Sequence, residues 1–228
     1  MIEFLFLDLD DTILDFHKAE QVAISATFRG FGIEPTPEVL ARYSQINKEC
    51  WHKLELGLWD REQVLVRRFE LLFAEYGIIQ EGTPVARAYE KNLGIGHWFL
   101  PGAEEAVEAL SKKYRLFLAS NGTASVQKGR MTSANLYRFF EVVFVSQELG
   151  ANKPAKEFFA RATAQIPDYD ASRAMMVGDS LTSDILGGIN AGMKTCWVNP
   201  KHLPADPAIP ADYEIESLQQ LEALLETL

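Results

Sequence analysis

Two aspartates near the start of the chain have a spacing that could serve chemistry. Asp8 and Asp10 follow directly after the apolar segment 4–7. Side chains at positions i and i+2 of an extended chain point to the same side, so the two carboxylates share one environment. Because like charges at short range repel each other, such a pair requires a proton or a cation nearby. The pair therefore indicates a metal site or a proton-transfer site.

Polar groups of other kinds follow three later apolar segments. They are Ser120 and Asn121 after 116–119, Lys153 after 142–145, and Asp179 with Asp184 after 174–177. Taken singly, an aspartate or a serine in such a position is typical of a helix N-cap, and a lysine is typical of a solvated surface. Together, the hydroxyl, amide, ammonium and carboxylate groups are suited to holding a phosphate group and a metal ion.

Metal-assisted phosphoryl transfer uses this set of groups. Mg²⁺ prefers oxygen ligands, and Asp8 and Asp179 can supply them. A carboxylate can also attack phosphorus, which makes Asp8 the candidate nucleophile. Asp10 can protonate the leaving oxygen and then deprotonate the attacking water. The Lys153 ammonium and the Ser120 hydroxyl would hold the phosphate oxygens while the charge shifts.

Five short apolar segments predict the strands that position these groups. They lie at residues 4–7, 116–119, 142–145, 174–177 and 195–198. Continuous hydrophobicity indicates strands that are buried on both faces, as in a parallel sheet with helices on either side. Helical patterns at 103–113 and 155–165 separate the later strands. The chain is therefore expected to form an α/β fold whose Rossmann-like core is a doubly wound parallel sheet, with the ligand site at the carboxyl ends of the strands.

The long interval between the first two strands predicts an inserted helical domain. Its helical patterns cover 17–29, 37–57, 61–76 and 85–93. We expect a core domain of residues 1–15 and 99–228, and a helical-bundle cap of residues 16–98 over the carboxyl ends of the strands. Trp51 in this cap is a candidate for stacking on a substrate base, and the alternative is that it packs in the interior of the cap.

Composition restricts the partners and the compartment. The net charge is −10, and a surface this acidic repels nucleic-acid polymers and anionic membranes. Two cysteines, Cys50 and Cys196, cannot build a disulfide framework, which favours reduced thiols in the cytoplasm. The first residues have no basic segment followed by a long apolar one, so a signal peptide and a membrane span are not expected.

The four motifs resemble those of the haloacid dehalogenase superfamily. They are DLDDT at 8–12, SNG at 120–122, KP at 153–154 and GDSLTSD at 178–184. The resemblance implies a helical cap of the C1 type, and Mg²⁺ held by the Asp8 and Asp179 side chains and the Asp10 carbonyl. Asp184 would either bind Mg²⁺ directly as a further ligand or contact the residues that bind it. An acid at the position of Asp10 resembles the phosphatases of this superfamily rather than its dehalogenases.

Within that superfamily the chain is similar to the house-cleaning pyrimidine nucleotidases. The similar segments are 45–48 with Trp51, 68–70, 184–192 and 195–197. The likeness implies a nucleoside 5′-monophosphate as substrate. The residues expected to bind it are Thr12, Trp51, Ser120, Asn121 and Lys153. Two alternatives stay open, namely a sugar-phosphate or phosphoglycolate phosphatase and a catalytically silent nucleotide-binding protein.

Overall fold

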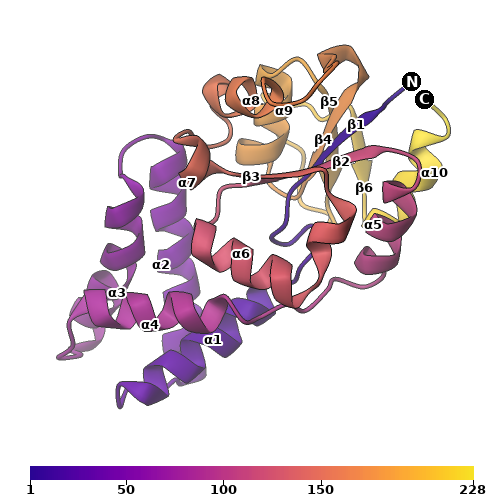
Figure 1. Cartoon of the computed structure of the whole chain (residues 1–228). Helices are drawn as coiled ribbons and strands as arrows, with labels where there is room; N and C mark the ends of the chain where they lie inside the picture. Colours follow the sequence, from indigo (N-terminus) through magenta and orange to yellow (C-terminus); the bar gives the residue numbers. More distant parts are fainter.

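A six-stranded parallel sheet forms the centre of the computed structural model, which describes residues 1–228 (Figure 1). The strand order is β3-β2-β1-β4-β5-β6, and every neighbouring pair is parallel. The strands are β1 (Phe4–Leu7), β2 (Arg115–Ser120), β3 (Val142–Val145), β4 (Ala174–Gly178), β5 (Lys194–Val198) and β6 (Tyr213–Ile215). The order changes direction at β1, so the carboxyl end of β1 lies at the switch point where such sheets bind ligands.

Side chains of β1 alternate between two apolar layers. Leu5 and Leu7 belong to a cluster that also contains residues of α5, α6 and α10, whereas Phe4 and Phe6 pack with residues of α8 on the other face. All four are fully buried. Burial on both faces explains why this strand is apolar throughout rather than alternating.

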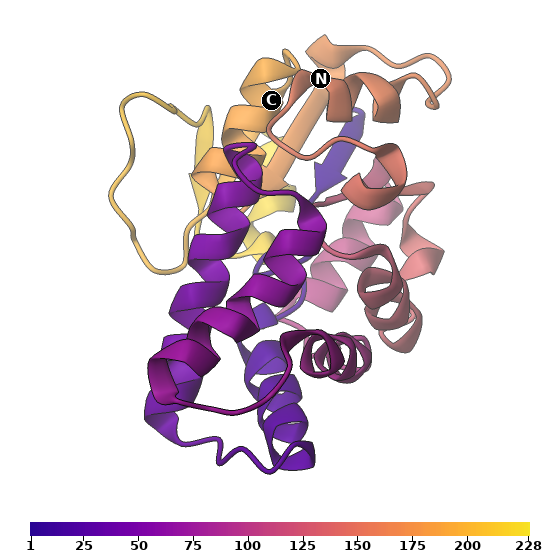
Figure 2. The same ribbon diagram turned by 90° about the vertical axis from the view of Figure 1, so that its left-hand side faces the viewer.

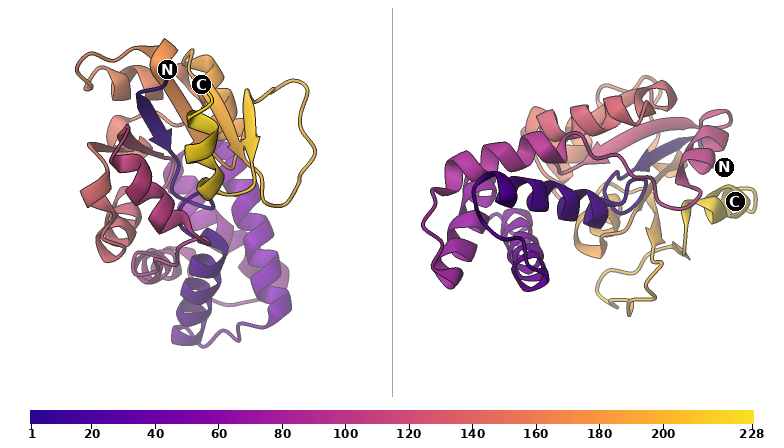
Figure 3. Two further views of the ribbon diagram at one scale, coloured as in Figure 1. Left: turned by 90° about the vertical axis from the view of Figure 1, so that its right-hand side faces the viewer. Right: turned by 90° about the horizontal axis from the view of Figure 1, so that it is seen from below.

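The core contains six α-helices and four shorter helical segments. The α-helices are α5 (Ala103–Ser111), α6 (Ala124–Ser133), α7 (Ser146–Leu149), α8 (Lys156–Thr163), α9 (Leu186–Asn190) and α10 (Leu221–Leu225). A π-helical turn covers Leu181–Ile185, and 3₁₀ turns cover Leu136–Phe139, Ala171–Arg173 and Leu218–Gln220. The chain termini lie close together on the side of the core remote from the inserted helices (Figure 1, Figure 3).

Four helices inserted between β1 and α5 pack around a hydrophobic cluster of their own (Figure 2). They are α1 (Phe16–Gly30), α2 (Pro37–Glu55), α3 (Arg61–Tyr76) and α4 (Gly82–Leu93). The side chains of Asp15, Thr36 and Asp60 accept hydrogen bonds from main-chain N–H groups of the first turns of α1, α2 and α3. These caps fix where each of the three helices begins.

The five predicted strands are confirmed, each within one residue at either end. The sixth strand was not predicted, because β6 has only three residues and lies half-exposed at the sheet edge, after the loop that projects from the core in Figure 2. The helix predicted over 37–57 ends earlier, at Glu55, and Gly57 adopts a left-handed conformation with φ of 69°. The helix predicted over 85–93 begins three residues earlier in the structure, because α4 starts at Gly82.

The inserted helices lie over the carboxyl ends of the strands, as the connections predict. Glu55 in α2 accepts a hydrogen bond from Thr182, which follows β4, and Arg61 in α3 donates to the main chain at Asn121, which follows β2. The view from below in Figure 3 shows this helical group extending from one end of the sheet. None of the helices combines the length and the apolar character that crossing a membrane requires.

Candidate active site

Three carboxylates from two neighbouring strands meet at the switch point of the sheet. Asp8 follows β1, Asp179 follows β4, and Asp184 lies in the π-helical turn after it; one oxygen of each lies within 4.8 Å of the others. The main-chain N–H of Ser180 donates to Asp184 over 3.0 Å. Three of the four acids predicted for the metal site, Asp8, Asp179 and Asp184, therefore lie together.

Lys153 provides the only positive charge in direct contact with this cluster. Its Nζ donates to Asp8 over 2.7 Å, to Asp184 over 2.6 Å and to the carbonyl oxygen of Ala119 over 2.6 Å. Burial lowers the pKa of the Lys153 ammonium, but the attraction of Asp184 and Asp8 outweighs it and holds the pKa above its ordinary value. Lys153 is therefore charged at neutral pH, with its three donors used.

One ammonium does not compensate three carboxylates. Burial raises the pKa of Asp8 to about 7, against the attraction of Lys153, and repulsion from Asp184 and Asp10 adds to the increase. Burial and repulsion from Asp184 and Asp8 raise the pKa of Asp179 well above its ordinary value. A hard divalent cation with oxygen ligands fits this donor set, because it would supply the missing positive charge.

Ser120 and Asn121 shape the loop after β2. The Ser120 hydroxyl is buried and accepts hydrogen bonds from the main-chain N–H of Gly122 over 3.0 Å and from Gln127 over 2.8 Å. The Asn121 side chain accepts from the Lys153 N–H over 2.8 Å and donates to the Lys153 carbonyl oxygen over 2.9 Å. The Asn121 side chain thus joins the loop after β2 to the loop that contains Lys153. The side chain is occupied by these bonds, so the main chain of Asn121 is the part that can face a phosphate.

The carboxylate of Asp10 lies outside the three-acid cluster. It forms an ion pair with Arg130 and accepts a hydrogen bond from Gln127 over 2.7 Å. Arg130 is fully buried, and its Nε donates to the carbonyl oxygen of Gly96 over 3.0 Å. Any metal role of Asp10 therefore rests on its main-chain carbonyl, as the resemblance implied.

Sequence reasoning missed Arg130 and Gln127. They lie three residues apart in α6 and so share one face of that helix. The available signal was weak, because an arginine and a glutamine in a short polar helix are typical of a solvated surface. Their burial becomes evident only when α6 packs beside the loop that carries Asp10.

The two remaining predicted residues take different positions. Thr12 is buried, and its hydroxyl has no hydrogen-bond partner in the protein. Trp51 is half-buried in α2 and packs against the apolar cluster of the inserted helices. Its ring lies 5.5 Å from the Arg61 guanidinium, which itself reaches the loop after β2. Trp51 therefore lies beside the boundary between the inserted helices and the site.

Residues 5–198 match the family described as haloacid dehalogenase-like hydrolase. The chain belongs to this hydrolase family. Of its relatives, the HAD-hydrolase YfnB of Bacillus subtilis is 38% identical over 97% of this chain and 94% of that protein. The pyrimidine 5′-nucleotidase PynA of Streptococcus pneumoniae is 35% identical over 96% of this chain and 93% of that protein. The pyrimidine 5′-nucleotidase YjjG of Escherichia coli is 31% identical over 98% of this chain and 97% of that protein.

The crystal structure of B. subtilis YfnB bound to magnesium superposes on this chain with a TM-score of 0.94 and 37% identity, covering 98% of both chains. That structure reveals interdomain movement. The superposition and the three clustered aspartates identify magnesium as the cofactor of this hydrolase as well. The protein is a haloacid dehalogenase-like hydrolase with a helical cap.

Proposed function

We propose that this protein is a Mg²⁺-dependent nucleoside 5′-monophosphate phosphatase with a preference for pyrimidine nucleotides. The observation that best supports phosphatase chemistry is that Asp8 and Asp10 contact different side chains. Asp8 contacts Lys153 within the acid cluster, whereas Asp10 contacts Arg130 and Gln127. Two carboxylates in such different surroundings can take different roles in one reaction.

In the first step, a carboxylate oxygen of Asp8 attacks phosphorus and the bond from phosphorus to the ester oxygen breaks. Asp10, in its protonated form, gives its proton to the departing ester oxygen, so the product leaves as an alcohol; the second step returns a proton to Asp10. In the second step, Asp10 takes a proton from a water molecule, and the water oxygen attacks phosphorus. The bond between phosphorus and Asp8 breaks, which releases phosphate and restores the carboxylate.

The surrounding groups support the charge on phosphate in both steps. Magnesium, when bound, neutralises negative charge on the phosphate and on the acid cluster. Asp8 and Asp179 with the Asp10 carbonyl would hold it, and Asp184 fixes the Lys153 ammonium on the far side of the cluster. Lys153 would hold a phosphate oxygen in exchange for one of its three present contacts, and Ser120 and the main chain at Asn121 would hold the other oxygens. The geometry and the resemblance both support these proposed residue roles.

The nucleotide preference depends on the cap. The proposed core groups would contact the phosphate and the metal, which are common to every phosphomonoester complex. Selection among substrates must therefore come from the residues that cover the leaving group. We propose residues 16–98 as this cap and residues 1–15 and 99–228 as the core. Similarity to PynA and YjjG supports a pyrimidine nucleotide, and Trp51 at the boundary is the candidate stacking partner. We also infer that the protein acts in the cytoplasm on a small metabolite.

Comparison of kcat/KM across a substrate panel tests the proposal. The panel contains uridine, thymidine and adenosine 5′-monophosphates, a sugar phosphate, phosphoglycolate and nitrophenyl phosphate. We expect the pyrimidine nucleotides to give the highest values. A higher value for the sugar phosphate or phosphoglycolate would replace the nucleotide with that substrate class. No Mg²⁺-dependent turnover of any compound would indicate a silent nucleotide-binding protein.

A tryptophan variant tests the cap contribution. Base stacking contributes about 1–3 kcal/mol, which corresponds to about 5- to 150-fold in selectivity. Trp51→Ala should reduce kcat/KM for the preferred nucleotide by such a factor and leave nitrophenyl phosphate nearly unchanged. Trp59→Ala is the matched control, because Trp59 packs in the same cap with Lys53 over its ring. Equal losses on both substrates in Trp51→Ala would show that Trp51 only packs.

A further inference from the structure

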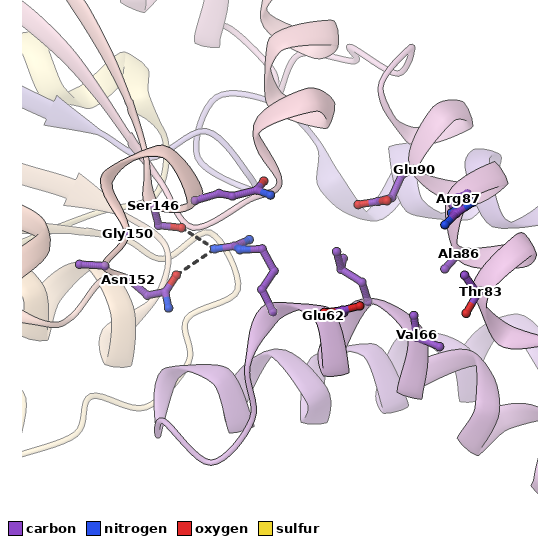
Figure 4. A pocket seen from close by; sticks show the side chains of 13 residues that line it. Glu62, Val66, Thr83, Ala86, Arg87, Glu90, Ser146, Gly150 and Asn152 are labelled. Carbon is purple, nitrogen blue, oxygen red and sulfur yellow. Dashed lines mark hydrogen bonds between the residues drawn. The ribbon is translucent and has the colours of Figure 1, made fainter.

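One arginine of the cap directs all of its guanidinium hydrogen bonds to the core. Arg61 is the first residue of α3, and its Nη1 donates to the carbonyl oxygens of Asn121 and Gly122 over 2.9 and 3.0 Å. Its Nη2 donates to the Ser146 hydroxyl over 2.6 Å and to the Asn152 side-chain oxygen over 2.8 Å. Figure 4 shows the latter two contacts as dashed lines.

Three of the four acceptors belong to the loops that carry the phosphate-binding candidates, and the fourth, Ser146, is the first residue of α7. Asn121 and Gly122 come directly after Ser120, and Asn152 directly precedes Lys153. The guanidinium is planar and presents its donors in a fixed fork, so contact with several loops at once also fixes their relative positions. Arg61 therefore holds, from the cap, the main chain on which the phosphate site depends.

The boundary beside Arg61 is hollow rather than closely packed. A hollow of about 540 Å³ lies there between α3, α4 and the core segment after β3 (Figure 4). Its polar lining includes Glu62, Arg87 and Glu90 from the cap, with Gln147 from the core. Arg61 spans this boundary without a carboxylate within ion-pair distance, and burial lowers its pKa. Water could therefore replace its contacts readily if the cap moved away.

The cap also contacts the core through the segment after α4, beside a second hollow that Gly94 and Gly129 help to line. Val126 of α6 belongs to the apolar cluster of the cap. A Cβ atom at Gly129 would lie 2.4 Å from the carbonyl oxygen of Gly94, so the two main chains touch. A movement that opens the cap would therefore break the four contacts of Arg61 with the core.

We propose that Arg61 is a positioning residue that couples closure of the cap to the shape of the phosphate-binding loops. When the cap is closed, Arg61 orders the loop after Ser120 and the loop before Lys153. When the cap opens, both loops lose this restraint and the phosphate site relaxes. The proposal rests on the phosphatase chemistry proposed above, but it is independent of which phosphomonoester is the substrate.

Hydrogen exchange and turnover of nitrophenyl phosphate test this coupling. Arg61→Met should raise amide exchange in peptides covering 119–123 and 150–154, and should reduce kcat by about 10- to 100-fold, as small misplacements near a reacting centre do. Arg61→Lys keeps the charge but cannot reach all four acceptors, so its loss should be intermediate. Arg67→Met is the control, because Arg67 lies on the same helix with its side chain 58% exposed.

The outcomes distinguish a positioning role of Arg61 from a contact with the leaving group and from no role. Equal exchange and turnover in Arg61→Met and Arg67→Met would overturn it. A loss confined to nucleotide substrates, with both loops unchanged, would instead show that Arg61 contacts the leaving group. If Arg61→Met does not fold, Arg61→Lys carries the same comparison. Should the wild type turn over no phosphomonoester, the exchange measurement still reports the loop restraint, so failure of the proposed function is distinguishable.

Discussion

Replacing Lys153 by methionine tests whether the acid cluster depends on a single buried cation. The side chain of Lys153 is 1% exposed, and its Nζ lies 2.7 Å from Asp8 and 2.6 Å from Asp184. With an effective dielectric constant of about 20, each attraction is about 6 kcal/mol before the cost of desolvation. Removing one partner of a buried ion pair costs about 3–5 kcal/mol net, because the remaining charges lose their compensation.

We therefore expect Lys153→Met to lower the free energy of unfolding by about 3–5 kcal/mol without metal. For a chain of this length, that change lowers Tm by about 6–20 °C. Excess Mg²⁺ should recover part of the loss, since it neutralises the same acids and binds only the folded state. Turnover should still fall by about 10²–10³-fold with Mg²⁺ present, because a donor to the phosphate oxygens is missing.

Urea unfolding at pH 8, with and without Mg²⁺, gives the stability change. Lys113→Met is the matched control, because Lys113 also bridges two carboxylates, Glu222 and Glu226, at 2.8 and 2.9 Å, but its side chain is 48% exposed. An exposed pair contributes only about 0–1 kcal/mol. If Lys153→Met were no more destabilising than Lys113→Met, the reasoning about the buried cluster would be refuted.

Three further predictions concern the acids and the metal. Asp10→Asn keeps the nucleophile but removes the proton donor, so steady-state kcat should fall by about 10²–10⁴-fold, and a loss below about 10-fold would argue against that role. Excess chelator should abolish turnover and added Mg²⁺ should restore it; full activity in chelator would contradict the metal requirement. Burial raises the pKa of Glu20 above its ordinary 4.5 in spite of hydrogen bonds from Ser44 and Asn47. The folded cap then retains this proton to higher pH than the unfolded chain, so stability falls as pH rises above about 4.5. Glu20→Gln should remove this pH-dependent part of the free energy of unfolding, measured by urea unfolding at a series of pH values. If wild type and variant showed parallel pH profiles, the assignment to Glu20 would be contradicted.

The fold was largely predictable because five strands are continuous apolar segments. β1 and β4 are buried along their whole length, and only the first one or two residues of β2, β3 and β5 are partly or fully exposed. The sixth strand, Tyr213–Ile215, gave no such signal, because it is short and pairs on one side only. The cap helices were visible through their periodicity, but their ends depend on caps such as Asp60 and on the left-handed Gly57.

The candidate site was predictable where a residue ends a strand or directly follows one. Asp8, Ser120 and Asp179 are placed by the sheet itself, since parallel strands end at one edge. Arg61 and Arg130 were not predictable, because their roles arise only when helices pack on loops distant in sequence. An arginine in a helix is typical of a solvated face, and the sequence alone contains no sign of its burial.

The central claim is that Asp8 forms a covalent bond to phosphorus during turnover. Rapid acid quench of the enzyme with radiolabelled substrate and Mg²⁺, followed by peptide mass spectrometry, tests it directly. We expect phosphate on the peptide that contains Asp8, at the first aspartate of the DLDDT segment, and no labelled protein for Asp8→Asn. Phosphate on any other residue, or turnover by Asp8→Asn at the wild-type rate, would contradict the account.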